Sequence, residues 1–167
     1  MSAISPTILT VGVGKEYSTI TAAVAASHNG DTVQVDAGSY TNDFADITNQ
    51  ITLVSVGATV NMVATELLPN KNGTLIVDNS AAIKGFSFSG AAISAGDGNN
   101  GACIRYQSGS LTLLDDDFTH NQDGRLATPA IAGTGRIDIE NSEFSANGSR
   151  DVGRALGKAI RYPMPVP

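Results

Sequence analysis

Three consecutive acidic residues, Asp115, Asp116 and Asp117, form the most conspicuous chemical group in this 167-residue sequence. Three carboxylates offer oxygen ligands for Ca²⁺, and a pair of them could act as the acid and the base of a glycosidase. The alternative is a tight bend, because Asp side chains bond the local backbone in such bends. Both interpretations stay open. Calcium is the one cofactor that these residues suggest, and the sequence otherwise predicts none.

A second polar cluster follows, with His120, Asp123 and Arg125 close together. A histidine can serve as a general base, and an arginine can bind the carboxylate of a uronic acid through two hydrogen bonds. Together with Asp116, these residues make the best candidate catalytic set. The alternative is a solvated polar loop with a surface histidine.

The elements that must position these residues are short strands and one helix. Apolar and polar residues alternate with a period of two in segments bounded by Gly, Asn, Asp or Ser, which predicts strands. These segments are 32–36, 51–54, 74–77, 83–88, 103–106, 111–113 and 136–139. Residues 18–28 are predicted to form a helix, with Ser18 as N-cap and one buried stripe. That stripe is Ile20, Ala23, Val24 and Ser27.

The strands belong to an internal repeat. Aligning Gly109 with Gly135, 26 residues later, places Leu111 on Ile137 and Phe118 on Phe144. The three aspartates then align with residues 141–143, at the bend between the second and third strands. A unit of roughly 27 residues with three short strands predicts one turn of a parallel β-helix, which climbs ~4.8 Å per turn.

A second ladder precedes each copy of the repeat. It is predicted to stack Ile76, Ile104, Ile131 and Ile160 on successive turns, with all four side chains inside the coil.

The opening of the chain resembles right-handed parallel β-helix proteins of the pectin-lyase-like superfamily. The segments that carry the resemblance are 14–20, 22–26, 30–33, 38–40 and 51–54. The resemblance implies an all-β, right-handed parallel β-helix of about five turns, with a short N-terminal helix as a lid. We expect a single domain over 1–167, with 1–30 as strand and helix, 31–162 as turns and 163–167 as a proline-rich tail. A partner subunit of a homo-oligomer, or further turns downstream, would cover the C-terminal end.

Positive charge is concentrated in the second part of the sequence. Every arginine lies within residues 101–167, where seven basic residues nearly balance eight acidic ones. Arg105 and Arg161 hold matching positions two turns apart, hence about 9.6 Å. Loops beside them contribute Arg125, Arg150 and Arg154. In the superfamily this face forms the saccharide groove, so the resemblance implies an arginine row that binds acidic polysaccharide. Pairing with neighbouring acids is the alternative.

Composition excludes several other classes of protein. A net charge of −6 argues against nucleic acid and anionic membranes as partners. The sequence contains no run of 18 apolar residues, so it predicts no membrane-spanning helix. The single cysteine, Cys103, excludes an internal disulfide framework and is expected to be a small apolar filler. No secretory leader is recognisable, so the compartment stays open.

Two classes of function remain. The first is a non-catalytic scaffold or carbohydrate-contacting module. The second is a polysaccharide-active lyase, hydrolase or esterase, or a fragment of one. The complete catalytic sets of pectinesterases, pectate lyases and polygalacturonases are absent from the sequence. Resemblance in fold alone does not define chemistry. Both arguments favour the first class.

Overall fold

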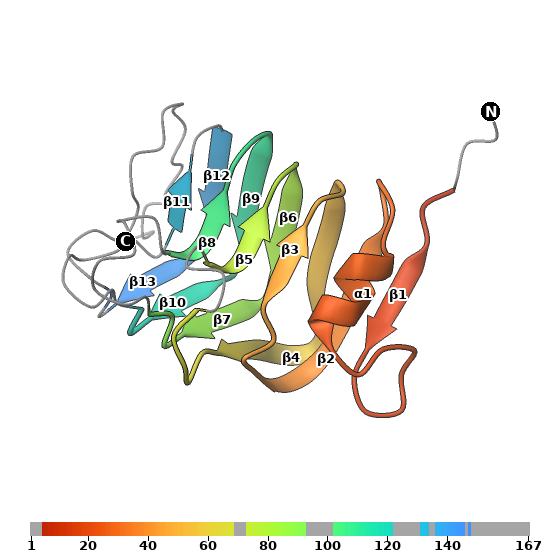
Figure 1. The fold of residues 1–167 in the computed structure, drawn as a ribbon, viewed down its shortest axis with the longest axis horizontal. Coiled ribbons are helices and arrows are strands. Elements are labelled where there is room, and N and C mark those ends of the chain that lie inside the picture. The colour runs from red at the N-terminus through yellow and green to blue at the C-terminus, as the bar shows by residue number, and fades with distance from the viewer. Residues whose placement is uncertain are drawn as a thin grey trace, which may run out of the picture.

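The protein is a parallel β-solenoid. The computed structural model describes residues 5–68, 73–92, 102–121, 131–133, 136–145 and 147. Strands make up 57% of it, and parallel sheets stack into a solenoid of about four turns with one short helix. The strands lie rung upon rung along the long axis, from β1 at one end to β12 and β13 at the other (Figure 1). The predicted all-β parallel coil is confirmed.

Two sheets form the walls of the coil in the described residues. Sheet A has nine strands: β1 (Ile8–Val11), β2 (Thr32–Thr41), β4 (Ile51–Val63), β6 (Ala81–Lys84), β7 (Phe86–Ser89), β9 (Ser110–Leu114), β10 (Asp117–Thr119), β12 (Arg136–Glu140) and β13 (Glu143–Ser145). Sheet B has four: β3 (Ala45–Ile47), β5 (Gly73–Val77), β8 (Ala102–Tyr106) and β11 (Ile131–Gly133). All their pairings are parallel.

One turn consists of a strand of sheet B followed by two strands of sheet A. β5, β6 and β7 form one turn, β8, β9 and β10 the next, and β11, β12 and β13 the one after. In the earlier turns the two sheet-A strands are continuous. β4 therefore pairs with β6 along its first part and with β7 along its last part.

The interior is filled by ladders of apolar side chains that repeat on each rung. Leu53, Ile83, Leu113 and Ile139 are successive partners along sheet A, and all are buried. Because successive side chains of a strand point to opposite faces, one register places a whole ladder inside. The alignment of Leu111 with Ile137 is confirmed.

A stack of aromatic rings fills the neighbouring corner of the coil. Phe88, Phe118 and Phe144 are register partners. Their ring centroids lie 5.0 and 4.8 Å apart, close to the spacing of the rungs, and the rings are nearly parallel. The predicted match of Phe118 with Phe144 is therefore confirmed, and each turn buries its ring against the next.

The prediction of the isoleucine ladder on sheet B is wrong at its first member, where the ladder contains Leu75 and not Ile76. Ile104 pairs with Ile131 as predicted, but its partner on the other side is Leu75, and Ile76 pairs with Arg105. Ile76 therefore faces away from the interior that Ile104 occupies. All five residues of β5 are buried, so the strand shows no apolar–polar alternation from which to choose the register. Ile160 lies outside the described residues.

The helix α1 (Ile20–Ala26) packs against β1, β2 and β3 near the N-terminal end of the coil. Its predicted stripe is buried. The cap is Thr19 rather than the predicted Ser18, since the Thr19 hydroxyl accepts a hydrogen bond from the Ala22 amide at 3.2 Å. The Asp43 carboxylate accepts the amide of Ile20 at 2.6 Å. This second acceptor comes from the next turn, which local pattern could not reveal.

The bend between the two sheet-A strands of a turn takes one left-handed residue. Gly85, Asp115 and Asn141 follow register partners and have φ of 76°, 57° and 50°. Asp and Asn are the non-glycine residues that tolerate this conformation best. The bend interpretation of Asp115 thus has direct structural support.

The sequence predicts about five turns, and the structure describes about four. The predicted last rung at residues 160–162 and the proline-rich tail lie outside the described residues.

Candidate functional site

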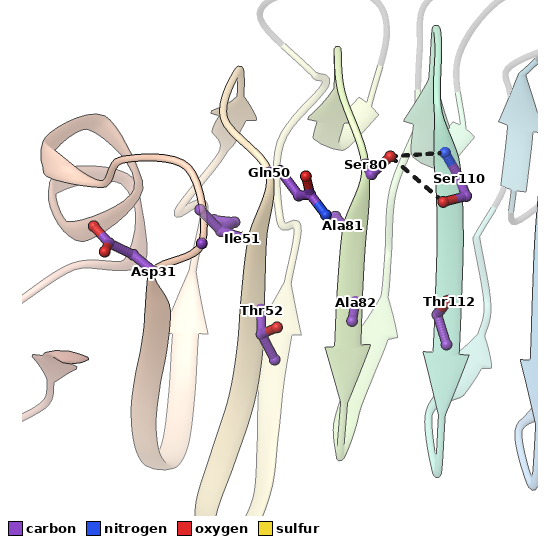
Figure 2. A pocket seen from close by; sticks show the side chains of 10 residues that line it. Asp31, Gln50, Ile51, Thr52, Ser80, Ala81, Ala82, Ser110 and Thr112 are labelled. Atoms are coloured by element: carbon purple, nitrogen blue, oxygen red, sulfur yellow. Dashed lines mark hydrogen bonds between the residues drawn. The ribbon is translucent and has the colours of Figure 1, made fainter. Parts of the chain in front are cut away.

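The outer surface of sheet A is hollowed where β4, β6 and β9 lie side by side. The hollow has a volume of about 300 Å³ and extends across these successive rungs (Figure 2). We call it the sheet-A groove. Its outward-facing side chains are those of Gln50, Thr52, Ser80, Ala82, Ser110 and Thr112.

Strand alternation arranges these side chains in two rows along the coil. Thr52 pairs with Ala82, and Ala82 pairs with Thr112, so the first row crosses the three strands in line (Figure 2). The second row, two positions earlier on each strand, contains Ser80 and Ser110. Alanine is smaller than threonine, so the side chain in the middle of the first row leaves space between its two neighbours.

The second row is held in place by hydrogen bonds between Ser80 and Ser110 at the start of β9. The Ser80 Oγ accepts hydrogen bonds from the Ser110 amide at 3.1 Å and the Ser110 hydroxyl at 3.4 Å. Gly109 precedes them with φ of 78°, and a Cβ there would lie 2.6 Å from the Ser80 Oγ. Among the described residues, the side chains of Gln50, Thr52 and Thr112 have no such partner.

Charged groups at the two ends of the groove are already paired. The side chain of Asp31 is buried and accepts hydrogen bonds from the amides of Thr7 and His28 at 2.8 and 2.7 Å. These amides hold the pKa of Asp31 below its ordinary value, with Thr7 contributing most. On the rung after β9, Arg136 donates two hydrogen bonds to Asp138 at 2.8 and 3.2 Å. The groove therefore offers uncharged donors and acceptors.

The three consecutive aspartates point in different directions, as alternation predicts. Asp115 has a 47% exposed side chain at the bend, 4.0 Å from the Lys84 ammonium. Asp116 is 2% exposed. Asp117 is on β10, in register with Glu143 on the next rung. The three carboxylates do not share one face, so the calcium site stays a prediction without geometric support.

Asp116 links three turns of the coil. Its Oδ1 accepts the Phe86 amide at 2.8 Å, and its Oδ2 accepts the Leu114 amide at 3.2 Å. Its own amide donates to the Ser142 hydroxyl at 3.1 Å. Burial raises the pKa of Asp116 to about 8, against the opposing effect of the two amides, and the nearby charge of Asp115 adds to the increase. These contacts favour a structural role at the bend.

His120 lies at the other end of β10 from Asp116. It has φ of 54°, and its Nδ1 lies 2.7 Å from the Thr119 hydroxyl. Asp116 is buried and both its oxygens accept amides, whereas His120 is exposed about 13 Å further along the extended chain, so the two side chains do not meet at one reacting centre. Asp123 and Arg125 lie outside the described residues. The described members of the candidate catalytic set therefore do not converge.

Arg105 lies on the outer side of β8, half-buried, in register with Ile76 and Ala132. Its neighbours on that side, Ile76 and Cys103, are 6% and 1% exposed. Burial raises the pKa of the Cys103 thiol, as expected for an apolar filler. Arg125, Arg150, Arg154 and Arg161 lie outside the described residues. The arginine row thus stays a prediction with one described member.

The fold and the groove together define a parallel β-solenoid with a hydroxyl-lined outer surface. Comparisons with protein-family models, with curated proteins and with solved structures find no match to the chain. In the described residues, no three side chains of the metal-binding types gather, and no helix reaches the length and apolar character that crossing a bilayer requires.

Sequence reasoning missed the sheet-A groove. Each strand shows ordinary alternation, so its serines and threonines indicate only a polar outer face. The available signal was a smaller residue, Ala82, at the position that Thr52 and Thr112 hold on the rungs beside it. Seeing it requires the register of residues 51–54, and the repeat alignment covered only later strands.

Proposed function

We propose that the protein is a non-catalytic β-solenoid module that contacts polysaccharide through its outer surface. The sheet-A groove is the observation that carries the proposal. It is a hollow of about 300 Å³ lined by hydroxyl and amide groups. Such groups both donate and accept hydrogen bonds, as sugar hydroxyls do. The resemblance to pectin-lyase-like proteins, whose coils contact saccharides, points in the same direction.

We propose a non-catalytic role because the described titratable groups of the candidate catalytic set, Asp116 and His120, either bond to the backbone or lie far from each other. Both oxygens of Asp116 accept backbone amides. His120 lies at the far end of β10 and contacts Thr119. Hydrolysis or elimination requires at least two such groups within reach of one reacting centre.

A polysaccharide-active enzyme is the second candidate, and one observation favours it. Asp117 and Glu143 are register partners on the outer side of β10 and β13. Their Cα atoms are one rung apart, ~4.8 Å, and the carboxyl groups of retaining glycosidases stand about 5–5.5 Å apart. An incubation with oligosaccharides that yields shortened products, lost in Asp117→Asn and in Glu143→Gln, would favour this candidate over the first.

A glycan array with neutral and uronate oligosaccharides tests the proposed function. We expect the full chain to bind at least one class of glycan and to leave it chemically unchanged. The variant Arg105→Ala separates the predicted arginine row from the sheet-A groove, because only binding at the row depends on that guanidinium. Absence of binding to every glycan would overturn the proposal.

A further inference from the structure

We propose that the sheet-A groove binds an uncharged, extended polysaccharide chain that runs along the axis of the coil, across β4, β6 and β9. This inference rests on the proposed function and names its site and its class of ligand. It differs from the predicted arginine row in both respects, since Arg105, the described member of that row, lies on sheet B and the row would select acidic chains.

The charge of the groove argues for an uncharged ligand. Its two rows present hydroxyl and amide groups. Asp31 is buried at one end and held by the amides of Thr7 and His28. Beyond the other end, Arg136 is bound to Asp138 by two hydrogen bonds. An acidic sugar would find no unpaired cation among the described lining residues, and its carboxylate would lose hydration without compensation.

The polar character of the lining argues against a protein partner. The exposed large apolar residues of the described chain are Ile8, Val13, Val56 and Leu67, and none of them lines the groove. The lining includes no aromatic residue. Protein interfaces usually centre on buried aromatic or aliphatic anchors, and this surface provides none.

The spacing of the rows argues for a chain along the coil axis. Equivalent side chains recur once per rung, ~4.8 Å, and one sugar residue of an extended chain advances by a similar distance. Successive residues of such a chain therefore meet equivalent groups on successive strands. Thr52 and Thr112 stand on either side of Ala82, so the ring over β6 fits between two hydroxyls.

The decisive variant fills the space above Ala82. Ala82→Leu places an isobutyl group between the two threonines on a half-buried outward position. Its control is Ser87→Leu, a leucine on an outward, half-buried position of the next strand, outside the groove. Both variants should unfold at the wild-type temperature. The probes are linear neutral hexasaccharides and an oligogalacturonate of the same length, measured by titration calorimetry.

We expect at least one neutral hexasaccharide to bind, with Ala82→Leu weakening binding at least about tenfold and Ser87→Leu less than about twofold. Thr112→Ala should weaken binding by about two- to tenfold, the usual range for one hydrogen bond. Binding of the oligogalacturonate alone, or equal binding by the two leucine variants, would overturn the inference and leave the proposed function standing. Failure of every glycan to bind would overturn the proposed function itself.

Discussion

The outer faces of the two sheets differ in how they meet solvent. On sheet A, Thr112 is exposed, and Thr52 and Ala82 are half-buried. On sheet B, Ile76 of β5 and Cys103 of β8 face outward and are 6% and 1% exposed, while Asp46, the register partner of Ile76 on β3, is exposed. Both faces belong to the same coil, with the same rung spacing and the same parallel pairing.

This difference shows that the coil alone does not decide which face is available to a ligand. Outward positions of one coil can be exposed to solvent or buried, and the type of side chain found at each position agrees with its exposure. Isoleucine and cysteine on sheet B belong inside a protein, whereas serine and threonine on sheet A tolerate water. Ligand contact is therefore expected on sheet A, although the arginine pattern of the sequence pointed to sheet B.

The largest expected effect comes from placing the same charged residue on each face. Ile76→Asp should lower the free energy of unfolding by about 4 kcal/mol, because it removes a buried apolar side chain and buries a carboxylate. Thr112→Asp, on the exposed face, should change it by less than about 1 kcal/mol. Urea denaturation followed by circular dichroism measures both.

Equal destabilisation by these two variants would contradict the contrast between the faces. Ile76→Val is the matched control, since it keeps the site apolar and should cost only about 1 kcal/mol.

A smaller effect on stability is expected at the bend of sheet A, where a polar residue of this sheet is buried like the outward residues of β5 and β8. Asp116 is buried there, and its native pKa of about 8 exceeds the ordinary value of 3.8. Between these values the native state holds a proton that the unfolded chain has lost, so stability is greatest at low pH and falls as pH rises. At about 1.4 kcal/mol per pH unit, we expect a loss on the order of 2–3 kcal/mol between pH 5 and pH 7.

The variant Asp116→Asn isolates this dependence, because its amide cannot lose a proton in that range. The difference between the wild-type and Asp116→Asn stability curves should reproduce the slope. Asp115→Asn should keep most of the wild-type slope, because burial contributes more to the raised pKa of Asp116 than the charge of Asp115 does. Asp31 does not interfere, because its lowered pKa affects stability only in more acidic solution. Parallel curves for wild type and Asp116→Asn would refute the assignment.

The sequence predicts the coil well because large apolar residues recur at equivalent positions of its repeat. Phe118 and Phe144, and Leu111 and Ile137, reveal their register directly, since each ladder alternates with polar residues. β5 has no such alternation, and the register was misplaced there by one residue. A strand buried on both sides carries no period-two signal.

The candidate site was less predictable, because its residues act through relations between turns. One of the two amides that Asp116 accepts belongs to Phe86, 30 residues away. The shape of the groove depends on one alanine between two threonines on neighbouring strands. Neither relation is visible in a local pattern. Three consecutive aspartates suggest a calcium or catalytic site by their composition, but their side chains point in different directions.

The smallest expected effect is a contrast between two thiols, one on each face. Cys103 is the only cysteine of the chain. It is buried on the outer side of β8, and burial raises its pKa. Since the thiolate is the reactive form, Cys103 should react with a disulfide reagent only after local opening.

The matched variant moves the thiol to sheet A by combining Cys103→Ala with Thr112→Cys. We expect this thiol to react as fast as a free thiol at pH 8, and Cys103 of the wild type to react at least about tenfold more slowly, a difference of about 1.4 kcal/mol. In denaturant the two rates should converge, because both thiols are then exposed. Equal rates in the native proteins would mean that the outer side of sheet B opens as readily as that of sheet A. The buried side chains of Ile76 and Cys103 would then no longer distinguish the two faces, and the case for a ligand on sheet A would rest on the shape of its groove alone.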